Sequence, residues 1–320
     1  MSGAALTIGN FDGVHLGHRA LIERARALAG SDGQVVAMAF WPHPISVLRP
    51  RQSPATLTTF DRRAQLLREL GADAVVRLEP TRDLLALEPE AFLRLVVGQH
   101  HPTAIVEGED FRFGRARAGT VRTLADLGAS MGFRADVVPP VRIATADQLV
   151  ADASSTLARW MIAEGRVRDA AGVLGRPHRV VGVVASGARR GRDLGFPTAN
   201  LNAETMLPAD GVYAGLATLP DGSQRPAAVS VGTNPTFGAE ARRLEAHILD
   251  WSGPADDYGW TLSIDLIAWL RDQVAYRGVQ PLIEQIHRDI ADTRSALERE
   301  GVRWRIASAR RPVGAETGAA

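Results

Sequence analysis

The hydrophobic pattern of this 320-residue chain changes its period at residues 174–177. Before that point, short apolar runs alternate with amphipathic segments of helical spacing, which predicts a parallel sheet with right-handed crossovers. At the break, Gly175 is expected to end a helix and Pro177 follows it, as is usual after a helix C-terminus. Beyond the break, polar and apolar residues alternate in short segments separated by turns, which predicts a small closed β-barrel.

The expected elements follow from these two patterns. In the first half, strands are expected at 4–8, 34–40, 74–78, 104–106 and 134–138, and helices from residue 19, at 61–70, at 89–97 and from 153 to about 174. In the second half, strands are expected at 179–184, 211–219, 226–231, 244–249 and 261–270, before a helix at 281–297. Pro42 and Pro44 are expected to exclude a helix after the second strand.

These elements predict two domains, for which the length is sufficient. Residues 1–176 are assigned to a Rossmann-like α/β domain and residues 177–308 to a β-barrel domain with a terminal helix. Residues 309–320 are expected to be a disordered tail, because they are rich in Pro, Gly and Ala.

The composition excludes several kinds of chemistry. The sequence has no Cys, which rules out thiolate catalysis, disulfides and Cys-based metal sites. It also has no Lys, which rules out a P-loop kinase and Schiff-base chemistry. Any chemistry on ATP must therefore use His, Arg, backbone amides and a metal ion.

Charge and hydropathy set further expectations. The formal net charge of +1 argues against nucleic acid as a partner. No apolar run is long enough to span a membrane, and the start has no signal-peptide pattern, so no membrane partner and a cytoplasmic location are expected.

The first motif is the string TIGNFDGVHLGH at residues 7–18. It lies where a predicted strand leads into a predicted helix, and helix N-termini attract anions. His15 and His18 are three residues apart, and Gly17 lets a ligand approach the backbone. This pattern favours a nucleotide phosphate over a metal ion; the alternative is a polar turn with two surface histidines.

Two further segments follow predicted strands of the same sheet, at the carboxyl ends where open α/β sheets bind ligands. His43 follows the second strand and is either a site residue or a turn histidine. Residues 108–114 (GEDFRFG) follow the fourth; there Asp110 and Arg112 indicate polar recognition, with Phe111 packed below. The alternative for this segment is a solvated, Arg-rich loop.

The helix expected from residue 153 begins with hydroxyl side chains. Ser155 and Thr156, with Arg159 one turn later, can hold triphosphate oxygens. The alternative is an ordinary N-cap.

The second half has a glycine-rich segment of its own, SGARRGRDLGFPTAN at residues 186–200. Its glycines free the backbone to surround phosphates with N–H donors. Thr198 and Asn200 offer neutral oxygen ligands that suit Mg²⁺. The alternative is a flexible surface loop.

Glu245 lies in an alternating strand and faces away from its apolar neighbours Leu244 and Ala246. A kinase that acts on a primary alcohol needs such a base to accept the hydroxyl proton. The alternative is a solvent-facing glutamate.

These strings resemble, in order along the chain, the signatures of the bacterial bifunctional riboflavin kinase/FAD synthetase family. GNFDGVHLGH, FWPHP, GEDFRFG and SSTLAR are similar to its nucleotidyltransferase half. The segment 186–200, GVY at 211–213, VGTNPTF at 231–237 and LEAH at 244–247 are similar to its kinase half. Two segments depart from the family pattern, around Leu157 and at Gln273–Tyr276.

The resemblance implies a two-step synthesis of FAD from riboflavin and ATP with Mg²⁺. Glu245 would be the base of the kinase, and His15, His18 and Arg159 would stabilise charge during adenylyl transfer to FMN. The implied nucleotide and flavin ligands of the first half are Gly9, Asn10, Phe11, Asp12, Gly13, His43, Asp110, Phe111, Arg112, Ser155 and Thr156. Those of the second half are Gly187, Arg190, Gly191, Arg192, Gly195, Phe196, Pro197, Asn234 and Arg271, with Thr198 and Asn200 as metal ligands.

Two other functions stay open at this point. One is a different His-x-Gly-His nucleotidyltransferase fused to an unrelated barrel. The other is a flavin-binding protein in which one site is inactive. The oligomeric state does not follow from the sequence.

Overall fold

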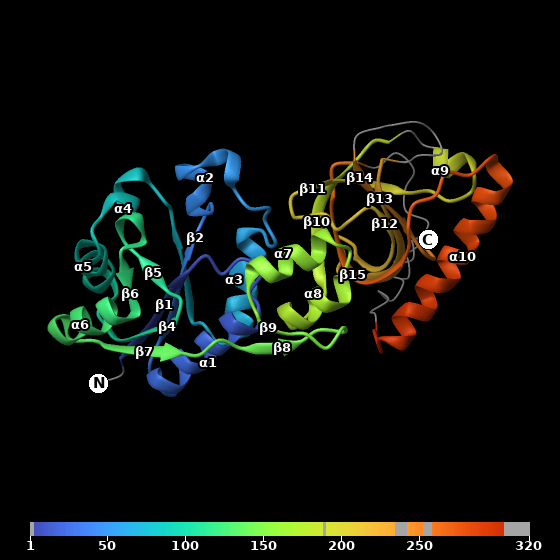
Figure 1. Cartoon of the computed structure of the whole chain (residues 1–320). Helices are drawn as coiled ribbons and strands as arrows, with labels where there is room; N and C mark the ends of the chain where they lie inside the picture. Colours follow the sequence, from blue (N-terminus) through green and yellow to red (C-terminus); the bar gives the residue numbers. More distant parts are fainter. Residues whose placement is uncertain (1–2, 188–189, 234–241, 252–257, 304–320) are drawn as a thin grey trace, which may run out of the picture. The chain divides into compact units, whose positions relative to one another are not determined.

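The computed structural model describes residues 3–187, 190–233, 242–251 and 258–303. Asn234, the tail 309–320 and the side chain of Arg190 therefore lie outside the described part. The described residues up to Arg179, together with Glu204–Ala209, form one compact unit. Val180–Ala203 and the described residues from Asp210 onward form the second (Figure 1).

The first unit is built on a five-stranded parallel sheet (Figure 1). Its strand order is β3 (Ala74–Leu78), β2 (Val35–Phe40), β1 (Ala4–Gly9), β4 (Pro102–Gly108) and β7 (Arg134–Val138). The chain leaves the central strand β1 toward β2 and β3 and later returns to its other side as β4 and β7. The order therefore reverses between β1 and β4, and in such sheets the ligand crevice lies outside the carboxyl ends of the strands at this reversal. The expected Rossmann-like class is confirmed.

Helices cover both faces of this sheet, because its strands are apolar on both sides. One face packs against α1 (Leu16–Ala29) and α3 (Phe60–Glu69). The other face packs against α5 (Pro89–His100) and α6 (Val121–Met131).

Shorter elements complete the first unit. They are α2 (Pro44–Leu48), the 3₁₀ turns Pro50–Gln52 and Arg115–Arg117, α4 (Arg82–Ala86), the pair β5 (Arg112–Phe113) and β6 (Gly119–Thr120), the pair β8 (Arg142–Ala144) and β9 (Val150–Asp152), α7 (Ser155–Ala163) and α8 (Val167–Leu174).

Three local expectations were wrong. The helix expected from 153 to about 174 is two helices, because Gly165 between them has a φ of +72° that a helix cannot contain. Helix α1 begins at Leu16 rather than residue 19, because His15 caps it. Pro44 does not exclude a helix but begins one, since the first helical position needs no N–H donor.

The second unit is a closed barrel, as expected, and it has six strands (Figure 1). Around the barrel the strands are β10 (His178–Ala185), β11 (Ala199–Ala203), β14 (Arg243–Ile248), β13 (Gln224–Gly232), β12 (Gly211–Thr218) and β15 (Thr261–Arg271). Strand β11 and the short helix α9 (Arg190–Asp193) were not expected. Both lie in or directly after the glycine-rich segment, whose sequence shows neither the helical spacing nor the alternation of apolar residues.

The terminal helix α10 (Val279–Arg299) packs against β12 and β15 through Ala296 and Leu297. In β14, Leu244, Ala246 and Ile248 are buried, and the residues between them are more exposed. The strand therefore presents Glu245 on the face opposite its buried side chains, as expected.

Candidate active sites

Segments that follow β1, β2, β4 and β7 surround a pocket of about 670 Å³ at the carboxyl edge of the first unit's sheet. The structure brings three separate motifs together around it. The expected site residues that line it are Gly9, Asn10, Phe11, His15, His18, His43, Asp110, Phe111 and Arg112.

The two histidines of the first motif stack at the N-terminus of α1. Their ring centroids lie 3.6 Å apart. The backbone N–H of Gly17 donates to Nδ1 of His15 (3.1 Å), and the backbone N–H of His15 donates to Nδ1 of His18 (3.2 Å). Because both Nδ1 atoms accept, each neutral ring must bear its proton on Nε2. Both imidazoles are therefore fixed as Nε2–H donors.

Burial and nearby cations keep these rings neutral. Burial, with the charges of Arg176 and Arg159, lowers the pKa of His15 to about 4. Burial, followed by His15, Arg63 and Arg176, holds the pKa of His18 well below its usual value. At neutral pH the pair thus offers hydrogen-bond donors without a positive charge of its own.

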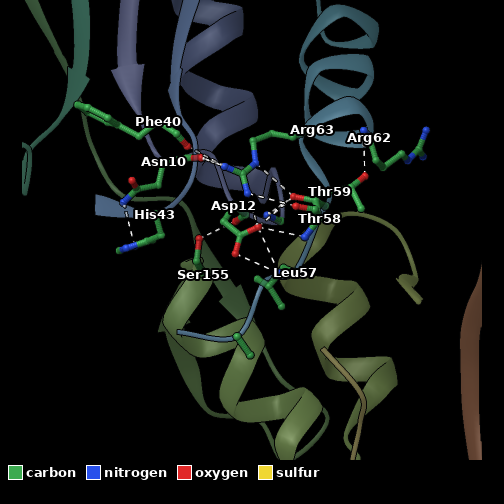
Figure 2. Close-up of polar contacts among 12 residues, drawn as sticks. Asn10, Asp12, Phe40, His43, Leu57, Thr58, Thr59, Arg62, Arg63 and Ser155 are labelled. Carbon is green, nitrogen blue, oxygen red and sulfur yellow. Dashed lines mark hydrogen bonds and ion pairs between the residues drawn. The ribbon is translucent and has the colours of Figure 1, made fainter. Parts of the chain in front are cut away.

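His43 caps α2 and contacts Asn10 (Figure 2). The backbone N–H of Ile45 donates to Nδ1 of His43, so the neutral ring bears its proton on Nε2. Asn10 Nδ2 lies 3.2 Å from that Nε2, but two N–H groups cannot bond to each other, so we assign the amide the flipped orientation, in which its oxygen accepts from Nε2. The other amide atom of Asn10, its NH₂ group in this orientation, is buried with no hydrogen-bond partner among the described residues. Asn10 itself lines the pocket, so this unpaired N–H donor belongs to the pocket wall.

Asp12 is not among the residues that line the pocket, and its carboxylate is bonded within the protein (Figure 2). Its carboxylate accepts hydrogen bonds from the backbone N–H groups of Leu57 and Thr58, both at 3.0 Å. It also pairs with Arg63 at 2.8 Å and Arg159 at 2.5 Å. Burial alone would raise its pKa, but Arg63, the Leu57 N–H group and Arg159 lower it. Asp12 is thus a buried anion that joins three segments.

The start of α7 turns toward Asp12 as well. Ser155 donates its hydroxyl to the backbone carbonyl of Asp12 at 2.7 Å (Figure 2). Arg159 donates to Asp12 and to the carbonyl of Ala55, and Thr156 is exposed. Ser155, Thr156, Arg159, Asp12 and Gly13 are not among the residues that line the pocket, although the adjacent Ser154 is.

Arg63 on α3 organises this region. Its side chain is 3% exposed. Its guanidinium donates to the carbonyls of Asn10 (2.6 Å) and Phe40 (3.2 Å), which follow or end β1 and β2, as well as to Asp12 (Figure 2). One side chain therefore fixes the ends of two neighbouring strands.

Glu107, near the end of β4, is another buried ionisable residue, and it lines the pocket. One of its oxygens accepts the backbone N–H of Ile8 at 2.6 Å. Burial, with the charge of Asp110, raises the pKa of Glu107 well above its usual value, although the Ile8 bond acts against this. The direction of this shift favours the protonated, uncharged carboxyl group.

Sequence analysis missed both Arg63 and Glu107, although each leaves a signal. Arg63 precedes Leu66 and Leu67 by three and four residues, which puts it on the same buried helix face. Glu107 is an acidic residue at the carboxyl end of an otherwise apolar strand.

The loop after β4 carries two aromatic rings, a few residues after Glu107 in the sequence. Phe111 and Phe113 stack with ring centroids 5.3 Å apart. Arg112 donates to the carbonyl of Phe111, and all three residues line the pocket.

In the barrel, the strand register brings the expected kinase residues together. Asn200 on β11 lies directly opposite Glu245 on β14, and Ser230 on β13 lies opposite Glu245 from the other side. Side chains of directly opposed residues point to the same face of a sheet. Gly187 approaches this row so closely that a Cβ there would lie 2.1 Å from the Asn200 amide nitrogen.

The rest of the glycine-rich segment is tied to the same strand. The N–H of Phe196 donates to the carbonyl of Gly191, and Gly195 has a φ of +85°. His247 on β14 donates from Nδ1 to the carbonyl of Pro197 at 2.9 Å. Arg192 is exposed.

Arg271 and Gln273 have contacts within the fold. Arg271 forms a bidentate pair with Asp289 of α10, at 2.8 and 2.7 Å. Gln273, in the segment that departs from the family pattern, donates to the hydroxyl of Ser230 at 2.9 Å. It therefore touches the row that contains Glu245.

No helix among the described residues has the length and apolar character to cross a bilayer. No group of three or more His, Asp or Glu side chains in that part of the chain is arranged to bind a metal ion.

Comparison with known proteins gave matches along most of the chain. The FAD synthetase family model matches residues 1–151, and the riboflavin kinase family model matches residues 174–297. Bifunctional riboflavin kinase/FMN adenylyltransferases are similar to it: that of Listeria monocytogenes is 34% identical over 295 residues, covering 91% of each chain. That of Escherichia coli K12 is 33% identical over 299 residues, covering 90% of each. A crystal structure described as a macrolide-efflux protein from Streptococcus pneumoniae superimposes with a TM-score of 0.80 at 30% identity, covering 92% of this chain and 94% of that one.

Proposed function

The chain belongs to the bifunctional riboflavin kinase/FMN adenylyltransferase family, and from this premise we propose which residues carry out each of its two reactions. It phosphorylates riboflavin with ATP and then transfers the adenylyl group of a second ATP to FMN, releasing pyrophosphate. The match to the riboflavin kinase model over residues 174–297 removes the alternative of an unrelated barrel.

The pocket of the first unit is the proposed adenylyl-transfer site. In this reaction an oxygen of the FMN phosphate bonds to the α-phosphorus of ATP, and the bond from that phosphorus to the pyrophosphate oxygen breaks. His15 and His18 donate from Nε2 to the phosphate oxygens on which charge builds up. The observation that carries this proposal is that backbone donors fix both rings in the same tautomer.

Two other groups support the same site. Asn10 offers its unpaired buried amide to a phosphate oxygen. Arg159, held by Asp12, is not a wall residue, yet its charge contributes to lowering the pKa of both His15 and His43. We assign it to stabilise negative charge in the pocket from a distance.

The row Asn200, Glu245 and Ser230 is the proposed kinase site. Glu245 accepts the proton of the riboflavin 5′-hydroxyl as that oxygen bonds to the γ-phosphorus of ATP, while the bond from that phosphorus to the bridging oxygen of the β-phosphate breaks and ADP leaves. The backbone of residues 187–200 surrounds the phosphates. Asn200 fits a Mg²⁺ ligand, because its neutral amide oxygen lies on the same face as Glu245, and Thr198 is the second candidate ligand. Bound Mg²⁺ neutralises charge on the phosphates.

One variant at each site tests this assignment. His15→Asn keeps a residue that caps helices well but removes the Nε2–H donor. It should reduce FAD formation from FMN by about 10²–10³-fold and leave FMN formation unchanged. Glu245→Gln should reduce FMN formation by about 10²–10⁴-fold and leave FAD formation from added FMN unchanged. Retention of full FAD synthesis by His15→Asn would refute the first assignment, and retention of full kinase activity by Glu245→Gln the second.

A further inference from the structure

One group in the pocket of the first unit has no task in the reaction described above. Glu107 is 2% exposed and belongs to the pocket wall. One carboxyl oxygen accepts from the Ile8 N–H group. No hydrogen bond of the other oxygen to a described residue is found, and that oxygen is not among the fully enclosed polar atoms that lack a partner, which indicates that it reaches the pocket space.

The position of this carboxyl group follows from the sheet. Strands β1 and β4 pair with Ala5 opposite Ala104 and Leu6 opposite Ile105. Two residues later the N–H of Ile8 bonds to the Glu107 side chain instead of to the backbone of β4. The carboxyl group is therefore fixed between the two strands where the strand order reverses, which is where such sheets bind their ligands.

The alternation of side chains along β4 determines which face of the sheet the Glu107 side chain points to. Ala104 and Val106 pack with the layer that contains α1, and Ile105 packs with the opposite layer. Glu107 is two residues beyond Ile105 and so points to that opposite side. That layer includes Phe92, Phe111 and Phe113, which also line the pocket, so Glu107 shares its side with an aromatic wall.

Burial and the neighbouring charges determine which protonation state of the Glu107 carboxyl group is favoured. No cation forms an ion pair with Glu107 in the described part of the chain, although Arg112 and Arg117 line the same pocket. Burial and the negative charge of Asp110 raise the pKa of Glu107 well above its usual value. The direction of this shift favours the protonated carboxyl group, in which the second oxygen can carry an O–H donor.

We infer that Glu107 is a specificity-determining residue of adenylyl transfer, whose second carboxyl oxygen donates a hydrogen bond to an acceptor atom on the heteroaromatic ring of a substrate. Two substrates have such a ring, the purine of ATP and the flavin of FMN, and both are flat enough to lie against the phenylalanine side chains. The inference rests on the proposal that this pocket is the adenylyl-transfer site.

Two substitutions of Glu107 separate a substrate contact from a structural role. Glu107→Gln keeps an oxygen for the Ile8 N–H group and a neutral donor for the ring. It should leave both KM values within about threefold of the wild type. Glu107→Leu removes the donor and should raise the KM of one substrate about tenfold or more, with little change in kcat. Equal KM values for wild type and Glu107→Leu would overturn the inference, and so would a Gln variant that loses as much as the Leu variant.

Substrate analogues identify the ring and do not depend on the stability of the Leu variant. The probes are ATP analogues with one purine nitrogen replaced by C–H, and FMN analogues with one ring nitrogen replaced by C–H or one carbonyl oxygen by sulfur. Wild type and Glu107→Gln should both bind one such analogue about tenfold more weakly than its parent, because the buried donor loses its acceptor. Equal binding of every analogue and its parent by the wild type would contradict the inference.

The proposed site and this inference fail differently. If His15→Asn keeps full FAD synthesis, the pocket is not the transfer site. If His15→Asn is inactive and the wild type still does not distinguish parents from analogues, the site stands and Glu107 has no role in specificity.

Discussion

For single residues, the chemistry of a site depends on which side-chain atoms already form hydrogen bonds within the protein. His15 and His18 were expected from their spacing, but their tautomers were not, because the donors that fix them are backbone N–H groups within the motif itself. Arg63 and Glu107 were missed because a composition or a motif does not report which charged side chains a fold buries. The sequence pattern shows that a charged side chain lies on an apolar face, but the groups to which that side chain bonds are known only from the structure.

The depressed pKa of His15 predicts how stability depends on pH. The folded pKa is about 4, and the usual value in an unfolded chain is about 6.5. Between these values the unfolded chain binds more protons at this site, so the contribution of His15 to stability falls as the pH falls from about 6.5 to 4. His15→Asn should therefore flatten the pH dependence of the free energy of unfolding in this interval, measured by urea denaturation. A slope equal to that of the wild type would contradict the assigned burial of the ring.

At the scale of the element, strands were easier to predict than the segments that connect them. The five parallel strands follow from apolar runs, and five of the six barrel strands follow from the alternation of polar and apolar residues. Strand β11 was missed because its sequence, ANLNA, has only one strongly apolar residue, and its pairing with β10 and β14 decides its structure. The break between α7 and α8 depends on one glycine with positive φ, which periodicity does not register.

Arg63 connects elements, and its removal tests that connection. Arg63→Met leaves the Asn10 and Phe40 carbonyls without this donor and leaves Asp12 with one cation fewer. Removal of one partner of a buried ion pair typically costs about 3–5 kcal/mol. We expect a loss of this size in the free energy of unfolding of the first unit, lower FAD synthesis and unchanged kinase activity. Exposed Arg94, which pairs with Glu90 one turn earlier, offers the control Arg94→Met, which should have little effect.

The close approach of Gly187 to Asn200 gives a test in the barrel. Gly187→Ala puts a Cβ within 2.1 Å of the Asn200 amide, so that side chain must move away from its place beside Glu245. Kinase activity should fall at least tenfold, while FAD formation from FMN stays unchanged. Gly172→Ala is the control, since a Cβ there meets nothing within 4 Å. Kinase activity equal in the two variants would show that the position of Asn200 does not matter.

At the scale of the whole molecule, the account rests on two chemically different ways to stabilise phosphates. One uses neutral imidazoles and a side-chain amide at the edge of a parallel sheet, and the other uses glycine amides beside a barrel strand. The order of motifs along the chain was enough to predict both reactions. It could not predict which of the motif residues, such as Asp12, Arg159 and Arg271, bond to other residues of the protein.

The central claim is that each reaction has its own site, and a mixing experiment tests it most directly. Riboflavin, ATP and Mg²⁺ are supplied to His15→Asn, to Glu245→Gln and to an equimolar mixture of both, and FMN and FAD are followed by chromatography. His15→Asn alone should accumulate FMN, Glu245→Gln alone should leave riboflavin unchanged, and the mixture should produce FAD. A mixture that makes no FAD, although both variants are folded, would contradict the account.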